Sequence, residues 1–165
     1  MPAHPTTPQG TPAGAWATLS RAMAELRTLA SVSNLLAWDQ ETYMPARGAA
    51  ARGEQVAAIE GTIHDRLASS EVAEALARLE ADPPADPDQA AAVRELGRDH
   101  ALAAAVPGEL VRAIARAQSD GLEAWKAARE GGGFARFAPA LSRMLELRRE
   151  QASALLGVLA RKARR

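Results

Sequence analysis

The sequence contains no cysteine, and its 20 Lys and Arg residues are balanced by 20 Asp and Glu residues. Without cysteine the chain has no disulfide, no thiolate metal ligand and no cysteine nucleophile. A formal net charge of zero gives no support for nucleic-acid binding, which normally requires a basic face. No uninterrupted apolar run is long enough to span a bilayer. We therefore expect neither a nucleic-acid partner nor a membrane partner.

Signals for secretion and for β-structure are also missing. Residues 1–10 have neither the basic start nor the apolar run of a secretory signal, so we expect a cytoplasmic protein. Residues 1–14 are rich in Pro, Thr and Gly and have little apolar surface to bury, which predicts a disordered tail. Alternation typical of strands occurs nowhere. We expect residues 15–165 to form a single helical domain.

The common catalytic motifs are absent as well. The chain has neither a Gly-x-Ser-x-Gly elbow nor a phosphate-binding Gly-x-x-x-x-Gly-Lys-Ser/Thr loop. Of its three histidines, His4 lies in the predicted tail, and neither His64 nor His100 begins a His-Glu-x-x-His. Glu60 and His64 are four residues apart, but a metal site needs further ligands. We assign the histidines structural or surface roles and predict no catalytic residue and no metal ligand.

What the sequence does contain is helical periodicity interrupted by proline and glycine. Apolar residues recur at steps of three and four in segments that end at Pro or Gly, which predicts an all-α fold of about six antiparallel helices without a sheet. The arrangement is either an open helical layer or a closed bundle. Asp86 is a predicted N-cap, with Pro87 at the first helical position. The predicted helices span about 15–37, 48–67, 70–80, 87–105, 107–130 and from 137 or 139 onward.

Two features of these helices predict how they pack. Gly48, Gly53 and Gly61 are poor helix residues, and three in one helix suggest close approach by another backbone. The first helix has a wide apolar face, which predicts heavy burial, and the last helix has a second apolar face. These faces comprise Trp16, Leu19, Met23, Leu26, Leu29, Val32 and Leu36, and Phe137, Leu141, Leu145 and Leu155.

The least generic stretch is Leu35–Pro45, where a predicted helix ends among large and polar side chains. Buried tryptophan and tyrosine need polar partners, and Trp38, Asp39, Gln40 and Glu41 are neighbours in sequence. One interpretation is a helix-end cluster whose polar groups satisfy one another. The other is that Asp39, Gln40 or Glu41 faces a ligand groove.

This stretch, Leu-Leu-Ala-Trp-Asp-Gln-Glu-Thr-Tyr-Met-Pro, also carries a resemblance. With the following Gly48–Gln55, it resembles the N-terminal region of the Taq-type thermostable metallocarboxypeptidases. The segments Ala68–Val72, Val106–Val111, Glu123–Arg129 and Phe134–Leu141 extend the similarity, which covers roughly Leu19 to Ala154. The tryptophan-centred motif is fairly specific, whereas the Ala/Leu helices are weak evidence.

The resemblance implies a helical zinc exopeptidase family whose members remove residues from peptide C-termini. Zinc or another divalent metal, and a peptide substrate, are expected only in the full-length context. The family's His-Glu-x-x-His lies beyond the part represented here, so this chain is expected to have no cofactor and no activity of its own. The alternative is a stand-alone, non-catalytic helical binding or interaction module.

An open helical layer cannot bury both faces of every helix, so we also predict self-association through an uncovered apolar face, most simply as a two-fold homo-oligomer. A closed monomer, in which the last helix covers the first two, is the alternative.

Overall fold

A computed structural model of the chain describes residues 11–162, and all regular secondary structure in that range is helical. No strand occurs within these residues, which confirms the all-α prediction. The helices are α1 (Pro12–Thr42), α2 (Ala49–Leu67), α3 (Ser70–Ala81), α4 (Pro87–Ala105), α5 (Gly108–Ala127) and α6 (Phe134–Lys162).

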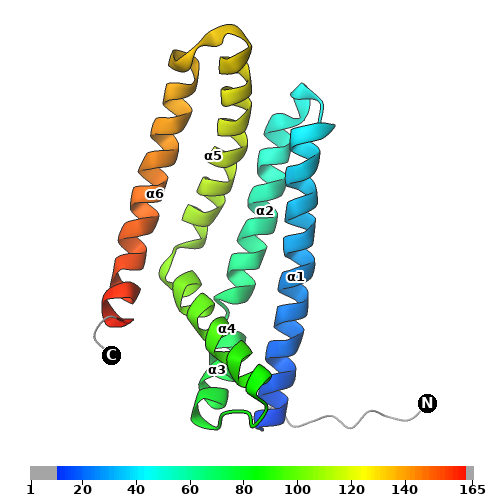
Figure 1. The fold of residues 1–165 in the computed structure, drawn as a ribbon, viewed down its shortest axis with the longest axis vertical. Coiled ribbons are helices and arrows are strands. Elements are labelled where there is room, and N and C mark those ends of the chain that lie inside the picture. Colours follow the sequence, from blue (N-terminus) through cyan, green and yellow to red (C-terminus); the bar gives the residue numbers. More distant parts are fainter. Residues whose placement is uncertain (1–10, 163–165) are drawn as a thin grey trace, which may run out of the picture.

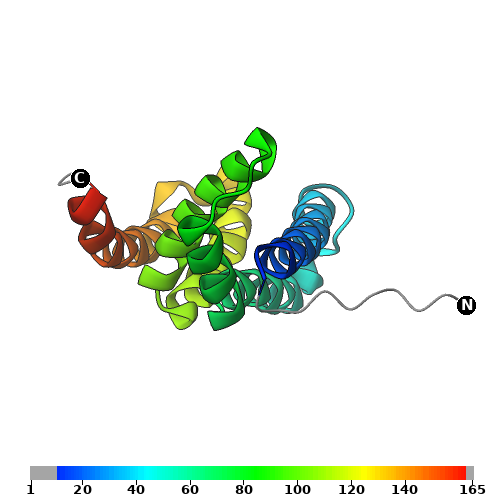
Figure 2. The same cartoon turned by 90° about the horizontal axis from the view of Figure 1, so that it is seen from below.

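The four long helices α1, α2, α5 and α6 run alternately up and down the molecule, side by side (Figure 1). α2 packs on α1 and α5, and α5 packs on α6, so α1 and α6 form the two edges. The shorter α3 and α4 lie across the lower end of this layer (Figure 2). α3 contacts α1, and α4 contacts α2 and α6. The bundle is therefore two layers deep at the lower end and one layer deep at the upper end.

The helix starts follow from local capping. The Thr11 side chain accepts a hydrogen bond from the Gly14 N–H, and Pro12 occupies the first turn, so α1 begins before the predicted Ala15. Residues 12–14 are thus helical, which corrects the predicted tail boundary; residues 1–10 lie outside the described range. Asp86 accepts hydrogen bonds from the N–H groups of the two residues after Pro87, which confirms the predicted cap of α4.

Two helix limits were predicted wrongly. α1 continues to Thr42, so Trp38 to Glu41 lie within its last turns rather than after its end. α6 begins at Phe134 and contains Pro139 in its interior, although a proline there removes one backbone hydrogen bond. The preceding turn explains the early start, because Gly131 (φ 148°) and Gly133 (φ 66°) adopt left-handed conformations that reverse the chain within a few residues.

The main core lies at the lower end, where α1, α3 and α4 meet. Leu19 and Val72 are fully buried there, and burial of each such side chain contributes about 1.5–3 kcal/mol. A second cluster joins the start of α5 to α6 through Leu147, whereas Leu145, which belongs to the predicted apolar face of the last helix, is 45% exposed. The first cluster comprises Ala15, Leu19, Ala22, Val72, Ala75, Leu76, Leu79, Val93 and Leu96, and the second Val106, Leu110, Ile114 and Leu147.

α2 packs closely on α5 through small residues. Gly53, Ala57 and Gly61 are buried on this side of α2. The predicted close approach at these glycines comes from side chains rather than from another backbone. A Cβ at Gly61 would meet the Arg112 guanidinium carbon at 2.9 Å, and one at Gly53 would meet Ser119 Cβ at 3.6 Å.

The upper half of α1 contradicts the predicted heavy burial of that helix. Val32 and Leu35 are 39% and 60% exposed, although both belong to an apolar stretch. No second layer covers this part of α1, because α3 and α4 lie only at the lower end (Figure 1). The hydrophobicity of these residues predicted burial, but none of the described helices packs against them.

Candidate functional site

Gln40 anchors the upper end of α1 to α5. Its side chain is buried, and its amide nitrogen donates to the Ser119 hydroxyl at 2.8 Å and to the Ser119 carbonyl at 3.3 Å. The ammonium group of Lys126 donates to the Gln40 carbonyl and to the Glu123 carboxylate, each at 3.0 Å. Gly53 of α2 lies beside Ser119 and, because it has no side chain, leaves space for the Ser119 side chain. Three helices are thus held in register by one polar cluster.

Asp39 faces the other neighbour, α2. Its carboxylate accepts a hydrogen bond from Arg52 at 2.5 Å, and a second nitrogen of Arg52 donates to the Leu36 carbonyl. The third guanidinium nitrogen donates to Gln55 at 3.0 Å. The Arg52 side chain is only 12% exposed, so this pair is better shielded from water than an ordinary surface ion pair. Arg52 therefore ties the end of α1 to the start of α2.

Trp38 and Tyr43 lie on the exposed side of the same helix end. Their rings make an edge-to-face contact with centroids 5.4 Å apart, yet Trp38 is 53% and Tyr43 75% exposed. Glu41 is exposed as well. The predicted cluster of mutually satisfied neighbours is therefore wrong: Asp39 and Gln40 find their partners on α2 and α5. Contact of Asp39, Gln40 or Glu41 with a ligand groove stays a prediction.

Arg52, Ser119 and Lys126 were missed in the sequence. Arg52 and Gly53 fall inside the Gly48–Gln55 stretch that carries the resemblance, which is a signal for their importance. Ser119 and Lys126 lie in an ordinary helical segment, and Ser119 is 79 residues from Gln40. No periodicity reports a contact over such a separation, so sequence reasoning had no means of pairing them.

His64 and His100 contact backbone carbonyls, as expected for structural residues, and His4 lies outside the described residues. His64 Nε2 lies 3.0 Å from the Ala103 oxygen and 2.8 Å from the Val106 oxygen. Carbonyl oxygens only accept, so this nitrogen carries a proton and offers no lone pair to a metal. His100 Nδ1 bonds the Leu67 carbonyl at 2.8 Å, and Glu60 accepts from Ser33 at 2.5 Å.

These donors do not fit a catalytic zinc ion. Such an ion takes three protein ligands and leaves a position open for water. No three His, Cys, Asp or Glu side chains converge in the part of the chain that the structure describes. Glu60 and His64, the one pair that the sequence suggested, are engaged with different neighbours.

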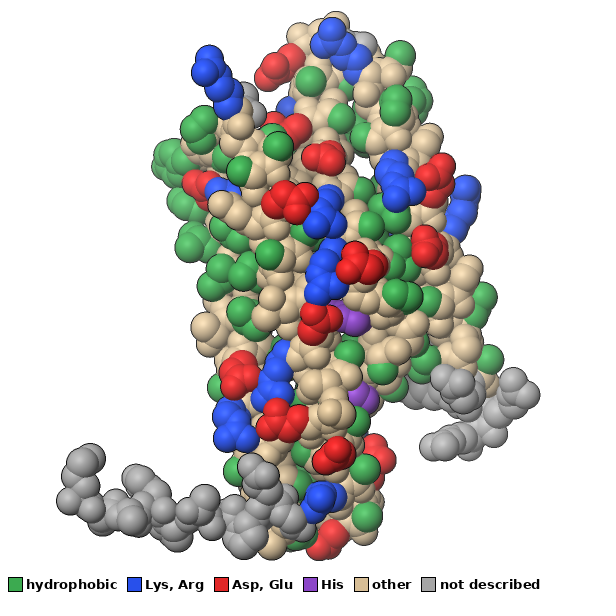
Figure 3. All heavy atoms as spheres, turned by 180° about the vertical axis from the view of Figure 1, so that it is seen from behind, with side chains coloured by type: hydrophobic (Ala, Val, Ile, Leu, Met, Phe, Trp, Pro, Cys, Tyr) green, Lys and Arg blue, Asp and Glu red, His purple; other side chains and the backbone are tan. Residues whose placement is uncertain are grey.

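Ion pairs run along the face opposite to Figure 1, where basic and acidic side chains alternate between helices (Figure 3). Arg66 of α2 binds Glu25 of α1 and Glu71 of α3, each at 2.6 Å. Hydrogen bonding by Arg66 holds the pKa of Glu71 below its ordinary value. Arg116 binds both carboxylate oxygens of Glu54 and likewise lowers the pKa of Glu54. These pairs connect neighbouring helices.

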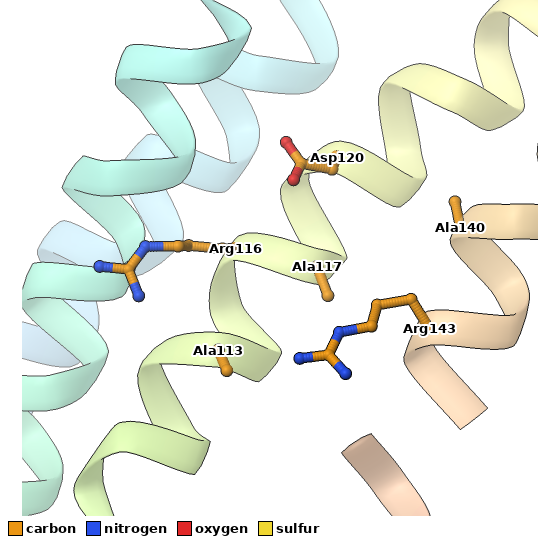
Figure 4. Close-up of a pocket in the computed structure, with 6 residues that line it drawn as sticks. All are labelled: Ala113, Arg116, Ala117, Asp120, Ala140 and Arg143. Atoms are coloured by element: carbon orange, nitrogen blue, oxygen red, sulfur yellow. The ribbon is translucent and has the colours of Figure 1, made fainter. Parts of the chain in front are cut away.

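The hollows in the described surface lack convergent chemistry. One lies between α5 and α6, has a volume of about 320 Å³ and includes Arg116, Asp120 and Arg143 in its lining. Figure 4 shows Arg116 extending toward α2, away from Arg143. Both arginines already bind glutamates, Glu54 and Glu146. A second hollow, of about 510 Å³, lies between α1 and α2 and is mostly apolar.

The described helices were also compared with the length and hydropathy of a bilayer-spanning helix. None of them combines the length and the hydropathy needed to cross a bilayer.

The described helices and the tryptophan-bearing end of the first one define an all-α helical bundle. Residues 18–162 match the family model described as Carboxypeptidase Taq (M32) metallopeptidase, and the chain belongs to this family. The match spans nearly the whole described range, which confirms the resemblance to Taq-type carboxypeptidases.

Individual relatives agree with the family match. Thermostable carboxypeptidase 1 of Thermus thermophilus is 34% identical over 151 residues, which are 90% of this chain and 30% of that protein. Among solved structures, Trypanosoma cruzi metallocarboxypeptidase 1 has a TM-score of 0.64 at 26% identity and covers 85% of this chain and 28% of its own. A Pyrococcus furiosus carboxypeptidase shares the fold, with a TM-score of 0.65 at 23% identity over 90% of this chain and 29% of its own. The chain thus spans less than a third of these relatives.

Proposed function

We propose that this chain forms the N-terminal, non-catalytic helical portion of an M32-type metallocarboxypeptidase that releases C-terminal amino acids from peptides. The observation that carries the proposal is the asymmetry of the match. About nine tenths of this chain aligns with under a third of a relative that is named as a carboxypeptidase. The metal-binding His-Glu-x-x-His and the catalytic Glu of the family belong to the portion outside this chain, and His64 and His100 contact backbone carbonyls.

The role of the chain in such an enzyme is to present a helical wall of fixed shape. The Gln40–Ser119 and Asp39–Arg52 contacts hold α1, α2 and α5 in register without a thick hydrophobic core at that end. In the assembled enzyme Gln40, Arg52 and Ser119 act as positioning residues, because they bind other helices rather than substrate. No catalytic step is assigned to any residue of this chain.

A chimera tests the proposal. The segment of Thermus thermophilus thermostable carboxypeptidase 1 that aligns with this chain is replaced by the corresponding residues of this chain. We expect the chimera to release C-terminal amino acids in a metal-dependent manner, and residues 1–165 alone to release none. The same relative with the segment deleted is the control and should be inactive. A folded but inactive chimera, or metal-dependent turnover by residues 1–165 alone, contradicts the proposal.

The two apolar clusters at the lower end favour a second candidate, a stand-alone helical interaction module. Leu19, Val72 and Leu79 bury almost all of their surface within this chain, so part of the structure has its own core. A module of this kind unfolds cooperatively by itself and gains no stability in the chimera. The enzyme portion, in contrast, gains stability from the rest of the M32 fold. Comparing thermal unfolding of residues 1–165 and of the chimera separates the two candidates.

A further inference from the structure

The turn that joins α6 to the rest of the molecule depends on glycine backbone conformations. α6 lies at one edge of the layer and packs on α5 and on α4 (Figure 1). Among the described residues, positive φ angles occur at Gly131 (φ 148°) and Gly133 (φ 66°), both in this turn. The turn reverses the chain, so that α6 runs back along α5. The place of α6 on its own chain therefore depends on these two glycines.

The space around the turn does not require glycine. A Cβ atom added at Gly131 or Gly133 meets no other atom within 4 Å. The requirement comes from the backbone alone, because positive φ is unfavourable for a residue that has a Cβ atom. This strain exists only while the turn is closed. A straightened turn has ordinary helical dihedral angles, which alanine adopts more readily than glycine.

Straightening the turn joins α5 and α6 into one long helix. The segment before the turn is already helical, since the π-helix Ala128–Gly132 continues α5 and the Gly133 N–H donates to the Ala128 carbonyl at 3.0 Å. α6 begins at the next residue, Phe134. With helical angles at the glycines, the 29 residues of α6 extend roughly 40 Å beyond the turn. In this form α6 no longer covers α5 and α4 of its own chain.

The surface that α6 leaves is shaped for an α6 helix. Leu147 of α6 is 2% exposed and packs with three apolar residues where α4 meets α5. Ala154 and Leu155, one to two turns further along α6, pack against the same cluster. The three residues that receive Leu147 are Val106, Leu110 and Ile114. The α6 of a second copy makes all of these contacts without any change of side chain.

We propose that two copies of this chain exchange α6 and form a two-fold dimer. In this dimer each turn is straight, and α6 of one copy lies on α5 and α4 of the other. A two-fold axis through the turns keeps α5 and the exchanged α6 antiparallel, as they are within one chain. The contacts of α6 are the same in both forms, so the turn and the protein concentration set the balance between them. This inference goes beyond the proposed function and does not depend on it.

Alanine at both turn glycines tests the inference. Gly131→Ala/Gly133→Ala strains the closed turn of the monomer but not the straight helix of the dimer. The dimerisation constant should rise at least about 500-fold, because each strained residue accounts for about fivefold and a dimer relieves four of them. Gly121→Ala/Gly157→Ala is the matched control, since these helix glycines lack positive φ and have open space around a Cβ atom. Sedimentation velocity over a dilution series measures both variants.

A cross-link distinguishes exchange from dimerisation through another surface. Ala117 of α5 and Ala140 of α6 line the same hollow, and the chain has no native cysteine. With Ala117→Cys and Ala140→Cys in the turn variant, a bismaleimide joins the two helices. In a monomer, or in a dimer formed through another surface, the link lies within one chain. In the exchanged dimer it joins two chains, which then migrate together on a denaturing gel.

Dimers of the turn variant with links between chains support the inference. A turn variant that folds as a monomer, or as a dimer with links only within each chain, overturns it. Equal dimerisation of the matched control also overturns it, because the turn is then not the cause. If the turn variant does not fold, the chain with native glycines and the two cysteine substitutions decides. After refolding from urea, links between chains that increase with protein concentration support exchange, and links within chains at every concentration overturn it.

Discussion

The lower and upper ends of this molecule are held together by different physics. At the lower end Leu19, Val72 and Leu79 come from α1 and α3 and bury nearly all of their surface against one another. At the upper end the helices are joined by directional contacts, mainly Gln40 to Ser119 and Asp39 to Arg52. Apolar packing tolerates residues of similar shape and volume, whereas a buried hydrogen bond requires particular partners. The lower end therefore depends on residue size, and the upper end depends on residue identity.

The largest expected effect is at the lower end. Leu19→Ala should lower the free energy of unfolding by about 2–5 kcal/mol, because it leaves a cavity between three helices. Leu35→Ala is the control, since Leu35 is exposed and its loss should cost no more than about 0.5 kcal/mol. Urea denaturation followed by circular dichroism measures both. Equal midpoints for the two variants would show that the lower cluster is not the main core.

At the upper end, Gln40→Leu should cost about 1–3 kcal/mol, because it leaves the buried Ser119 hydroxyl without its donor. Ser119→Ala removes the other partner. The double variant should lose less than the sum of the two single variants, since neither polar group then remains unpaired. A double-mutant cycle in urea measures the coupling. Strict additivity would contradict a direct contact between these residues.

A smaller effect separates two helix glycines. Gly61→Ala places a methyl group against Arg112, which is bound to Asp65, and should cost about 1 kcal/mol. Gly121→Ala meets no atom within 4 Å and should stabilise α5 by up to about 1 kcal/mol through helix propensity. Thermal unfolding of the two variants gives the comparison. Stabilisation by both substitutions would mean that the α2–α5 contact is looser than the structure shows.

The smallest effect concerns the surface ion pairs that connect neighbouring helices. The pKa of Glu71 is lowered by the hydrogen bond from Arg66, and that of Asp65 mainly by the bond with His64. A lowered pKa in the folded state means that the unfolded state binds the proton more readily. The stability contributed by these carboxylates is therefore present above their unfolded pKa values, about 4, and is lost as the pH falls through the lower folded values.

Urea midpoints measured between pH 6 and pH 2 check this dependence. Glu71→Gln should flatten the decline, and added salt should weaken it, because these carboxylates are exposed. Midpoints of the wild type and Glu71→Gln that fall in parallel would remove Glu71 from the explanation.

The lower end was largely predictable from the sequence, and the upper end was not. Val72, Leu76 and Leu79 recur at helical spacing, and Val93 and Leu96 do the same on α4; all are buried as expected. Periodicity reports such burial because apolar packing repeats with each helix turn. The upper half of α1 shows the limit of that signal. Val32 and Trp38 are of residue types that are usually buried, yet both are exposed, because a hydrophobic pattern does not say whether another helix packs against it.

The sequence singled out Trp38 to Glu41 as an unusual stretch, and a ligand role for these residues stays a prediction. In the structure Asp39 and Gln40 make specific cross-helix contacts. Their partners were not found, because no sequence pattern pairs residues on different helices, and Ser119 is 79 residues from Gln40. The histidines were predicted to be structural, and the carbonyl contacts of His64 and His100 agree with that role.

The glycine turn before α6 has a consequence for how the molecule opens. α6 is joined to α5 through Gly131 and Gly133 in left-handed conformations and contributes Leu147 as its buried anchor. Phe134, Leu145 and Leu156 are exposed, whereas Phe137, Leu141 and Leu155 are half-buried. Detaching α6 thus exposes Leu147 and these half-buried side chains, but leaves the main core of α1, α3 and α4 intact. We therefore expect native-state hydrogen exchange in α6 to proceed by partial opening, and exchange of the α3 amides to require global unfolding.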